Sequence, residues 1–334
     1  MKKFVFKVKE KKFISYKKIM VIAEIGSNHD NDFEKCRTLI EKASKIGCDA
    51  IKIQMFKADE LISTKHPAYN FLKKYELKKS WLEKISKICK KNNILFMCSP
   101  FYKDAIPLLK KSKCDILKIA SPEIKNLPLI KKAINSGLPI IISTGDSDLE
   151  IIHDAIKIFK RFDKKKLAIL HCTSQYPASL NNLNLNNIEN LNKKFPKISI
   201  GFSDHSSDDQ AACIASSLGV NIIEKHITLN KNSKGPDHSI SMNIKDFKIM
   251  VDKIRNVKII LGNKNKRRLN DENTVYINIF SKKILKKNKK IKLVDLICKR
   301  DFKNKIPSKY IDKIVDKIPK IDIEKDTPLE WRQF

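Results

Sequence analysis

Residues 19–26 read Ile-Met-Val-Ile-Ala-Glu-Ile-Gly, a short apolar run that contains a single charged side chain. Runs of this length that are rich in β-branched residues are typical of buried strands. Similar runs recur along most of the chain. Strands are therefore predicted at residues 19–26, 50–56, 94–100, 116–121, 139–145, 167–174, 198–204 and 222–228.

Amphipathic stretches separate these runs, and their apolar residues recur at helical spacing. Helices are predicted at residues 32–46, 81–92, 127–135, 149–159 and 209–218. Three of them are followed by Gly47, Gly137 and Gly219, where a left-handed C-cap is expected.

This alternation of strands and helices is typical of an α/β protein with a parallel sheet. Eight such units within about 250 residues favour a closed (β/α)8 TIM barrel. No G-x-G-x-x-G sequence follows the first strand, which removes the main support for an open dinucleotide-binding sheet.

The alternation of strand-like and helix-like segments ends near residue 265. We predict a barrel domain over residues 1–265, a polar linker over 266–274 and a small second domain over 275–334, with strand-like pieces at 275–279 and 291–297. The segment 57–80 is long for a loop after the second strand, and we expect it to form part of the wall above the site.

The chain has 334 residues and a formal net charge of +32, which suggests a nucleic-acid partner at first sight. Its lysines are spread over almost every predicted helix, as on solvated faces, so no nucleic-acid partner is expected.

No apolar run approaches the ~20 residues needed to cross a bilayer, so no membrane partner is expected. Residues 1–18 lack the apolar core of a signal peptide. The eight cysteines are scattered without a C-x-x-C pair, which favours free thiols and a cytoplasmic protein.

Polar residues stand at the carboxyl ends of the predicted strands, where the active sites of such barrels lie. Buried polar groups need partners, so their presence there indicates a function. One set, with cations and hydroxyls suited to a phosphate and a carboxylate, comprises Lys52, Lys118, Ser121, Ser143 and Ser203. A second set, suited to one divalent ion, comprises His205 and His226. A third, with acceptors for sugar hydroxyls, comprises Glu24, Gln54, Glu123, Tyr176 and Asp237.

Two alternatives stay open for these residues. Lys52 could form a buried salt bridge with Glu24 instead of binding a ligand. A single histidine is more often structural than a metal ligand, but two at the ends of neighbouring strands, each in a polar cluster, favour a metal site.

Short motifs spread over most of the chain carry a resemblance to one family. They read IAEIGSNH (22–29), DAIKIQ (49–54), CSPF (98–101), LKIASPEI (117–124), IISTG (141–145), LHCTSQYP (170–177), GFSDH (201–205), IIEKHITL (222–229) and GPDHSISM (235–242). Together they resemble the sialic acid synthases, which include the N-acetylneuraminate, legionaminic acid and pseudaminic acid synthases. The resemblance implies a TIM barrel followed by a small C-terminal antifreeze-like (SAF) domain, in a domain-swapped homodimer.

The resemblance also implies roles for individual residues. The catalytic set would be Glu24, Lys52, Lys118 and Glu123. The substrate-binding set would be Gln54, Ser99, Ser121, Ser143, Ser174, Tyr176, Ser203, Asp237 and Arg300. The metal, Mn²⁺ or Mg²⁺, would be held by His205 and His226.

The chain departs from the family pattern at three places. Ser99 stands where the family often has threonine, which keeps a hydroxyl, and Ser174 stands where some members have asparagine. In the small domain the usual K-R-P-G stretch reads Lys-Arg-Asp-Phe at residues 299–302. Arg300 there matches the arginine expected to contact the acceptor's N-acyl group.

The expected activity is a metal-dependent condensation of phosphoenolpyruvate with an N-acetylated amino sugar and water, giving a nine-carbon sugar acid and phosphate. The acceptor stays open between N-acetylmannosamine and the related 6-deoxy diacetamido sugars that lead to legionaminic or pseudaminic acid. The GPDH motif at 235–238 favours the sialic or legionaminic branches. The alternative from another class, a basic nucleic-acid-binding protein on this scaffold, predicts missing strand-end groups and a one-sided basic stripe.

Overall fold

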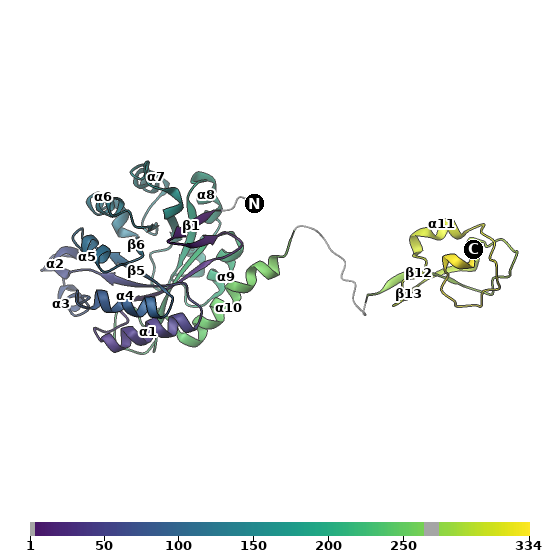
Figure 1. Cartoon of the computed structure of the whole chain (residues 1–334), viewed down its shortest axis with the longest axis horizontal. Helices are drawn as coiled ribbons and strands as arrows, with labels where there is room; N and C mark the ends of the chain where they lie inside the picture. Colours follow the sequence, from purple (N-terminus) through teal and green to yellow (C-terminus); the bar gives the residue numbers. More distant parts are fainter. Residues whose placement is uncertain (1–3, 264–273) are drawn as a thin grey trace. The chain divides into compact units, whose positions relative to one another are not determined.

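The computed structural model describes residues 4–263 and 274–334. The chain divides into two compact units, Met1–Gly262 and Asn263–Phe334, which carry the labels β1–α10 and β12–α11 in Figure 1. Apart from Thr274, the linker predicted at 266–274 lies outside the described residues.

Eight parallel strands form a closed barrel in the first unit. Their bounds are β3 Met20–Gly26, β4 Ala50–Met55, β5 Leu95–Pro100, β6 Ile116–Ile119, β7 Ile140–Ser143, β8 Leu167–Cys172, β9 Ser199–Asp204 and β10 Ile222–Thr228. Each strand pairs with the next along the chain, and β10 pairs with β3 to close the ring. A short strand, β11 (Met242–Asn243), pairs with the end of β10. The predicted TIM barrel is therefore confirmed.

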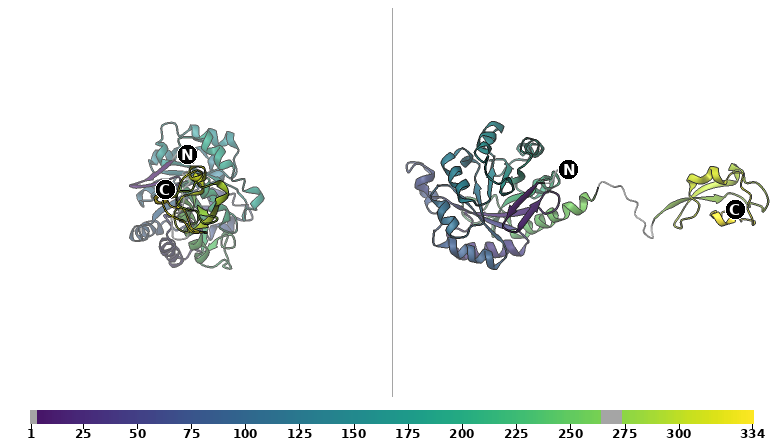
Figure 2. Two further views of the ribbon diagram at one scale, coloured as in Figure 1. Left: turned by 90° about the vertical axis from the view of Figure 1, so that its right-hand side faces the viewer. Right: turned by 45° about the horizontal axis from the view of Figure 1, so that its top comes forward.

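Helices lie outside the strands, as Figures 1 and 2 show. The longer ones are α1 Phe33–Lys45, α4 Trp81–Lys91, α5 Ala105–Lys111, α6 Leu127–Ser136, α7 Leu149–Lys157, α8 Asn187–Lys194, α9 Gln210–Ser217 and α10 Ile244–Leu261. The glycines predicted to follow three helices adopt left-handed φ angles of +90° at Gly47, +74° at Gly137 and +92° at Gly219. That prediction is confirmed too.

An antiparallel hairpin precedes the barrel, and the sequence did not lead us to expect it. It consists of β1 (Val5–Val8) and β2 (Lys11–Ile14), labelled β1 in Figure 1. Phe6, Val8 and Phe13 are fully buried in one apolar cluster with the first residues of several barrel strands, such as Met20 of β3. The hairpin therefore closes the amino-terminal end of the barrel, which leaves the other end for the site.

The long segment 57–80 folds into two short helices, α2 (Ala58–Leu61) and α3 (Tyr69–Lys73). Lys73 of α3 pairs with Asp59 of α2 at 2.8 Å. The side chain of Asn31, in the loop after β3, donates to the carbonyl oxygen of Lys74. The segment thus contacts a loop at the carboxyl ends of the strands, consistent with the predicted wall.

The second unit contains two antiparallel strands, β12 (Tyr276–Ser281) and β13 (Leu296–Asp301), and a short helix, α11 (Ile311–Ile314). Its core comprises Ile279, Leu285, Ile291, Leu296, Ile306, Ile314, Ile323 and Leu329. The prediction of a strand at 291–297 was wrong, because β13 begins only at Leu296. Ile291 is a buried core residue ahead of the strand, so burial rather than strand pairing explains its apolar side chain. The antifreeze-like assignment and the domain-swapped homodimer stay predictions.

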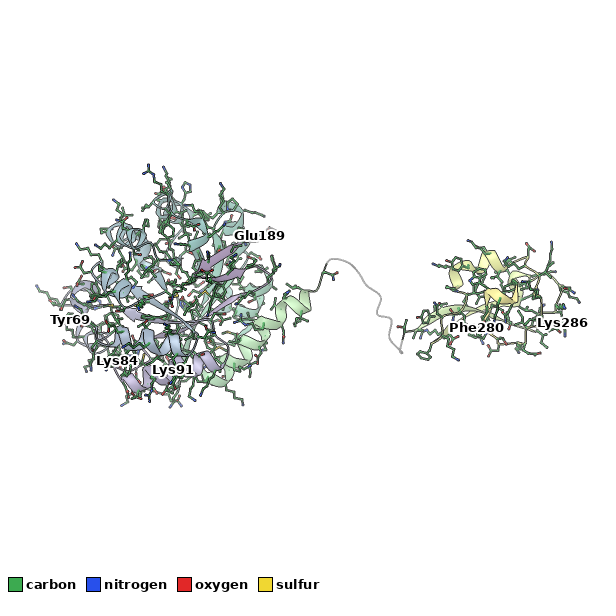
Figure 3. The ribbon with its side chains drawn as sticks, viewed as in Figure 1. Tyr69, Lys84, Lys91, Glu189, Phe280 and Lys286 are labelled. Atoms are coloured by element: carbon green, nitrogen blue, oxygen red, sulfur yellow. The ribbon has the colours of Figure 1, made fainter. Side chains whose placement is uncertain are left out.

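The abundant lysines have a local role on the helices. Lys42 and Lys45 lie in the last turn of α1, and Lys90 and Lys91 in the last turn of α4. Cations there stabilise the negative end of the helix dipole. Lys84 and Lys91 project outward from α4 in Figure 3. Among the described residues, no helix has both the length and the apolar character that a membrane crossing requires.

Candidate functional site

Two lysines and two glutamates meet inside the carboxyl end of the barrel. The Oε1 atom of Glu224 accepts hydrogen bonds from Lys52 Nζ at 2.7 Å and from Lys118 Nζ at 3.1 Å. Lys52 Nζ also lies 3.3 Å from Glu24 Oε2. The alternative considered for Lys52, a buried ion pair with Glu24, is therefore present, and sequence reasoning gave Glu224 no role.

The two carboxyl groups differ in their electrostatics. Burial raises the pKa of Glu24 to about 7, against the attraction of Lys52. Burial acts the same way on Glu224, but Lys118 and Lys52 outweigh it and hold the pKa of Glu224 far below its ordinary value. Glu224 is thus a permanent anion, whereas Glu24 can take up or release a proton near neutral pH.

The two lysines differ as well. Burial lowers the pKa of Lys118 to about 8 although Glu224 opposes the shift. Burial would also lower the pKa of Lys52, but the two glutamates raise it above its ordinary value. With Glu24 protonated, two cations face a single carboxylate charge. The pocket therefore attracts an anion.

Hydroxyl groups surround this network. Ser203 Oγ donates to Glu224 Oε1 at 3.1 Å, whereas Ser99 Oγ and Ser143 Oγ are buried with no hydrogen-bond partner among the described residues. Buried hydroxyls without partners are rare and call for an explanation. Such donors are available to the oxygen atoms of a ligand.

A glycine brings two further serines together. The amide of Gly145 donates to Ser121 Oγ at 3.0 Å. A Cβ atom at Gly145 would lie only 2.3 Å from Ser174 Oγ and 3.0 Å from Ser121 Oγ. Ser121 and Ser174 were predicted inside strands, but β6 ends at Ile119 and β8 at Cys172, so both lie on loops beyond the strand ends.

Two imidazoles face each other across the ends of β9 and β10. The ring centroids of His205 and His226 lie 5.7 Å apart, and the ring of Tyr176 lies 4.2 Å from that of His205. His205 Nδ1 lies 2.9 Å from the carbonyl oxygen of Thr173, so it carries the proton and leaves Nε2 with a free lone pair. His226 Nδ1 is buried without a hydrogen-bond partner among the described residues.

These imidazoles suit a divalent metal ion. Burial lowers the pKa of His205 to about 4 and that of His226 to about 3, so both are neutral at physiological pH, the form that ligates metals. Within residues 4–263 and 274–334, no group of three or more His, Cys, Asp or Glu side chains could hold a metal. The protein would supply two ligands and leave the others to substrate and water.

Three of the five predicted sugar-facing residues, Glu24, Gln54 and Asp237, gather around Gly26. Gln54 Nε2 donates to Glu24 Oε1 at 3.0 Å. A Cβ atom at Gly26 would lie 2.8 Å from Asp237 Oδ2, 3.2 Å from Glu24 Oε1 and 3.4 Å from Gln54 Nε2. Burial raises the pKa of Asp237. Gly26, with a φ of +52°, thus lets three polar side chains meet at one point.

Two predicted residues are not joined to this cluster by any described contact. The carboxylate of Glu123, two residues after Ser121, accepts from the side chain of Asn126 at 2.6 Å, and Asn126 caps α6. Arg300 lies on β13 of the second unit, opposite Ile277, with an exposed side chain. Their predicted roles stay predictions.

Comparison with known proteins identifies the family. A sequence model of the NeuB family matches residues 39–266. The chain is 35% identical over 311 residues to N,N'-diacetyllegionaminic acid synthase from Campylobacter jejuni, covering 88% of this chain and 92% of that one. It is 32% identical to a Campylobacter jejuni pseudaminic acid synthase, with 96% and 98% covered.

A solved structure agrees with these relatives. The N-acetylneuraminic acid (sialic acid) synthetase of Leptospira borgpetersenii, in complex with citrate, superposes with a TM-score of 0.74 at 32% identity. The match covers 79% of this chain and 92% of that one. The chain therefore belongs to the NeuB family of sialic-acid-type synthases.

Proposed function

We propose that this protein condenses phosphoenolpyruvate with an N-acetylated amino sugar and water, releasing phosphate and a nine-carbon sugar acid. The observation that carries the proposal is the pair Lys52 and Lys118, both buried, beside serine hydroxyls at the open end of the barrel. A small ligand with two anionic groups would find cations and donors here without rearrangement of the protein.

Phosphoenolpyruvate fits this set by charge and by hydrogen bonding. Lys52 and Lys118 would neutralise its carboxylate and phosphate. The hydroxyls of Ser99 and Ser143, which have no hydrogen-bond partner in the described part of the chain, and the serines beside Gly145 would donate to the remaining oxygens. Glu224 would keep both lysines at fixed positions while the anion is bound.

The reaction balances without a further co-reactant. The enol carbon forms a bond to the aldehyde carbon of the open-chain sugar, water adds to the former C2, and the C–O bond to phosphate breaks. Water must lose a proton and the aldehyde oxygen must gain one. Glu24 suits the transfer of a proton at its carboxyl oxygens because its pKa of about 7 lies near the operating pH.

His205 and His226 would hold the divalent ion, Mn²⁺ or Mg²⁺, with their neutral imidazoles. When bound, such an ion supplies Lewis acidity towards the carbonyl oxygen of the acceptor. Tyr176, whose ring lies 4.2 Å from that of His205 at an interplanar angle of 35°, would close one side of this part of the pocket.

The acceptor sugar would lie against Gln54, Glu24 and Asp237, whose polar atoms converge at Gly26. These groups can bind sugar hydroxyls or the second N-acetyl group of a diacetamido sugar. Two of the relatives described above are named as legionaminic and pseudaminic acid synthases, which supports testing the diacetamido sugars beside N-acetylmannosamine.

Purified protein with phosphoenolpyruvate, Mn²⁺ and each of three acceptors tests the proposal through acceptor-dependent phosphate release. The acceptors are N-acetylmannosamine and the diacetamido sugars that lead to legionaminic and pseudaminic acid. A Lys118→Met variant should lose about 10²–10³ in turnover. The proposal fails if no acceptor stimulates phosphate release, and salt-dependent, sub-micromolar binding of duplex DNA in that case would favour the nucleic-acid-binding alternative.

A further inference from the structure

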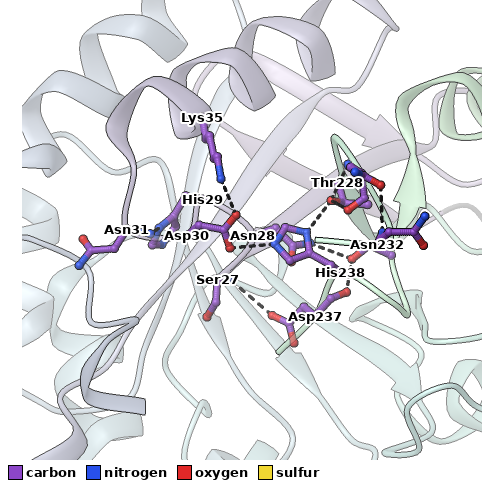
Figure 4. A network of polar contacts seen from close by, with 12 residues as sticks. Ser27, Asn28, His29, Asp30, Asn31, Lys35, Thr228, Asn232, Asp237 and His238 are labelled. Atoms are coloured by element: carbon purple, nitrogen blue, oxygen red, sulfur yellow. Dashed lines mark hydrogen bonds and ion pairs between the residues drawn. The ribbon is translucent and has the colours of Figure 1, made fainter. Parts of the chain in front are cut away.

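A network of hydrogen bonds joins the first and last strands of the barrel, and Figure 4 shows it. His238 Nε2 lies 2.8 Å from Asp30 Oδ1, and His238 Nδ1 lies 2.7 Å from Thr228 Oγ1. Asp30, in the loop after β3, also accepts from Lys35 Nζ at 2.9 Å. His238 thus lies between the ends of two strands that are adjacent in space and about two hundred residues apart in sequence.

The direction of the hydrogen bond between His238 and Asp30 follows from the charge of Asp30. Burial would raise the pKa of Asp30, but the hydrogen bonds from His238 and Lys35 outweigh it and lower the pKa. As a carboxylate, Asp30 can only accept, so His238 carries its proton on Nε2. The other ring nitrogen, Nδ1, shares a hydrogen bond with the hydroxyl of Thr228, and the same hydroxyl lies 3.2 Å from the carbonyl oxygen of Asn230 in the loop.

A second tether runs beside the first. Asn28 Nδ2 donates to the carbonyl oxygen of Ile227 at 2.9 Å and to Ser241 Oγ at 2.8 Å. Ser241 Oγ in turn donates to the carbonyl oxygen of Asp237 at 2.5 Å. Asn28, Ser241 and Thr228 are all buried. Residue 237 is therefore held through its own carbonyl and through its neighbour His238.

These tethers control a segment that has no regular structure of its own. Residues 229–241, between β10 and β11, contain no helix or strand, so their order depends on side-chain contacts. Gly235 packs tightly on the network: a Cβ atom there would lie 2.7 Å from His238 Cδ2 and 3.2 Å from Asp30 Oδ1. Asp237 Oδ2 accepts from the amide of Ser27 at 3.4 Å, and a Cβ atom at Gly26 would lie within 3.4 Å of Asp237 Oδ2, Glu24 Oε1 and Gln54 Nε2.

We propose that His238 is a positioning residue that sets affinity for the acceptor sugar. Clamped between Asp30 and Thr228, it fixes the 229–241 loop so that Asp237 faces the acceptor beside Gln54. This inference rests on the proposed function. The described hydrogen bonds of the network reach neither Lys52 and Lys118 nor the serines around them, so phosphoenolpyruvate binding is not expected to depend on it.

Thr228 offers a matched pair of variants. Thr228→Val keeps the shape of the side chain and removes the hydroxyl, whereas Thr228→Ser keeps the hydroxyl. With Thr228→Val we expect the KM for the acceptor to rise about tenfold and the KM for phosphoenolpyruvate to change by less than about twofold. Thr228→Ser should have the same two KM values as the parent. Equal increases in both KM values, or a serine variant as impaired as the valine variant, would overturn the proposal.

Amide hydrogen exchange of the full chain tests the tether independently of activity. Thr228→Val should speed exchange in residues 229–241, and Thr228→Ser should not. Asn221→Ala is the control: Asn221 is buried at the opposite end of the same strand and bonds to Ser199 Oγ at 3.0 Å and to the carbonyl oxygen of Phe13. It should lower stability without changing exchange in the loop.

The two experiments separate the two proposals. If the parent releases no phosphate with any acceptor, the proposed function falls while the exchange measurement still tests the tether. Loop exchange in Thr228→Val equal to that of the parent would refute the positioning role of His238, whatever the activity.

Discussion

Replacing Glu224 with glutamine tests whether this carboxylate stabilises two charged lysines inside the barrel. The change preserves shape but removes the charge that lies 2.7 Å from Lys52 Nζ and 3.1 Å from Lys118 Nζ. At an effective dielectric constant of about 20, unit charges about 4 Å apart attract by about 4 kcal/mol. Part of that loss is offset, because the variant no longer buries a carboxylate. Breaking a buried pair typically costs about 3–5 kcal/mol, which is the expected fall in unfolding free energy at pH 6.

The expected loss of unfolding free energy in the Glu224→Gln variant is smaller at pH 9 than at pH 6. Burial lowers the pKa of Lys118 to about 8 in the parent, and without Glu224 this pKa falls further. A lysine with a lower pKa in the folded chain binds fewer protons there than in the unfolded chain, so stability rises with pH above the folded pKa. This rise in stability begins at a lower pH in the variant than in the parent. The difference in unfolding free energy between the two proteins therefore narrows from pH 6 to pH 9.

Urea unfolding followed by far-UV circular dichroism at pH 6, 7.5 and 9 measures this difference. Glu189→Gln is the control, since Glu189 pairs with Lys193 on an exposed helix face and its loss should leave stability unchanged. A Glu224→Gln variant as stable as the parent at pH 6, or a difference that widens towards pH 9, would refute the reasoning.

Three other substitutions probe separate parts of the first unit. His226→Ala should abolish phosphate release with little change in fold, and should remove any rise in melting temperature that Mn²⁺ gives the parent; unchanged turnover would contradict the metal assignment. Gly145→Ala should lower kcat/KM for phosphoenolpyruvate by about 100-fold, because the new Cβ would lie 2.3 Å from Ser174 Oγ; an unaltered value would show that these serines do not bind it. Burial lowers the pKa of His29 to about 4. Below about pH 6.5 the unfolded chain therefore binds a proton on this imidazole that the folded chain does not bind, and the free energy of unfolding falls as the pH falls through this window. In urea titrations, His29→Gln should therefore lose about 2 kcal/mol less stability than the parent between pH 7 and pH 5, and an equal loss would exclude His29 as the cause.

The barrel could be predicted because its strands are buried on both faces. Every residue of β3 is buried, so this strand is a nearly continuous apolar run that the sequence displays directly. The hairpin was missed because its apolar side chains alternate with lysines. Phe6 and Val8 flank Lys7, and the alternation marks a strand with one buried face, but the abundance of lysine obscured it.

The candidate site residues were predicted from the carboxyl ends of the strands. Glu224, which was given no role, could have been found from the alternation of side chains along its strand. Side chains two residues apart point to the same face of a strand, so Glu224 faces inward with His226. Lys225 points to the other face, where its Nζ lies 2.7 Å from Asp204 Oδ2. The shared binding of two lysines by one glutamate could not be predicted, because strand order and register must be known first. Arg300 lies on β13 of the second unit, and its role was predicted from the family resemblance alone.

The pairing of β10 with β3 has a consequence for biosynthesis. A polypeptide leaves the ribosome amino end first, so Lys52 and Lys118 emerge long before Glu224, their partner from the far end of the barrel sequence. Contacts between such distant residues form late in folding. Until then both lysines can stay hydrated, and they enter the protein interior together with their counter-charge. A nascent chain that stops before residue 222 therefore has no finished pocket.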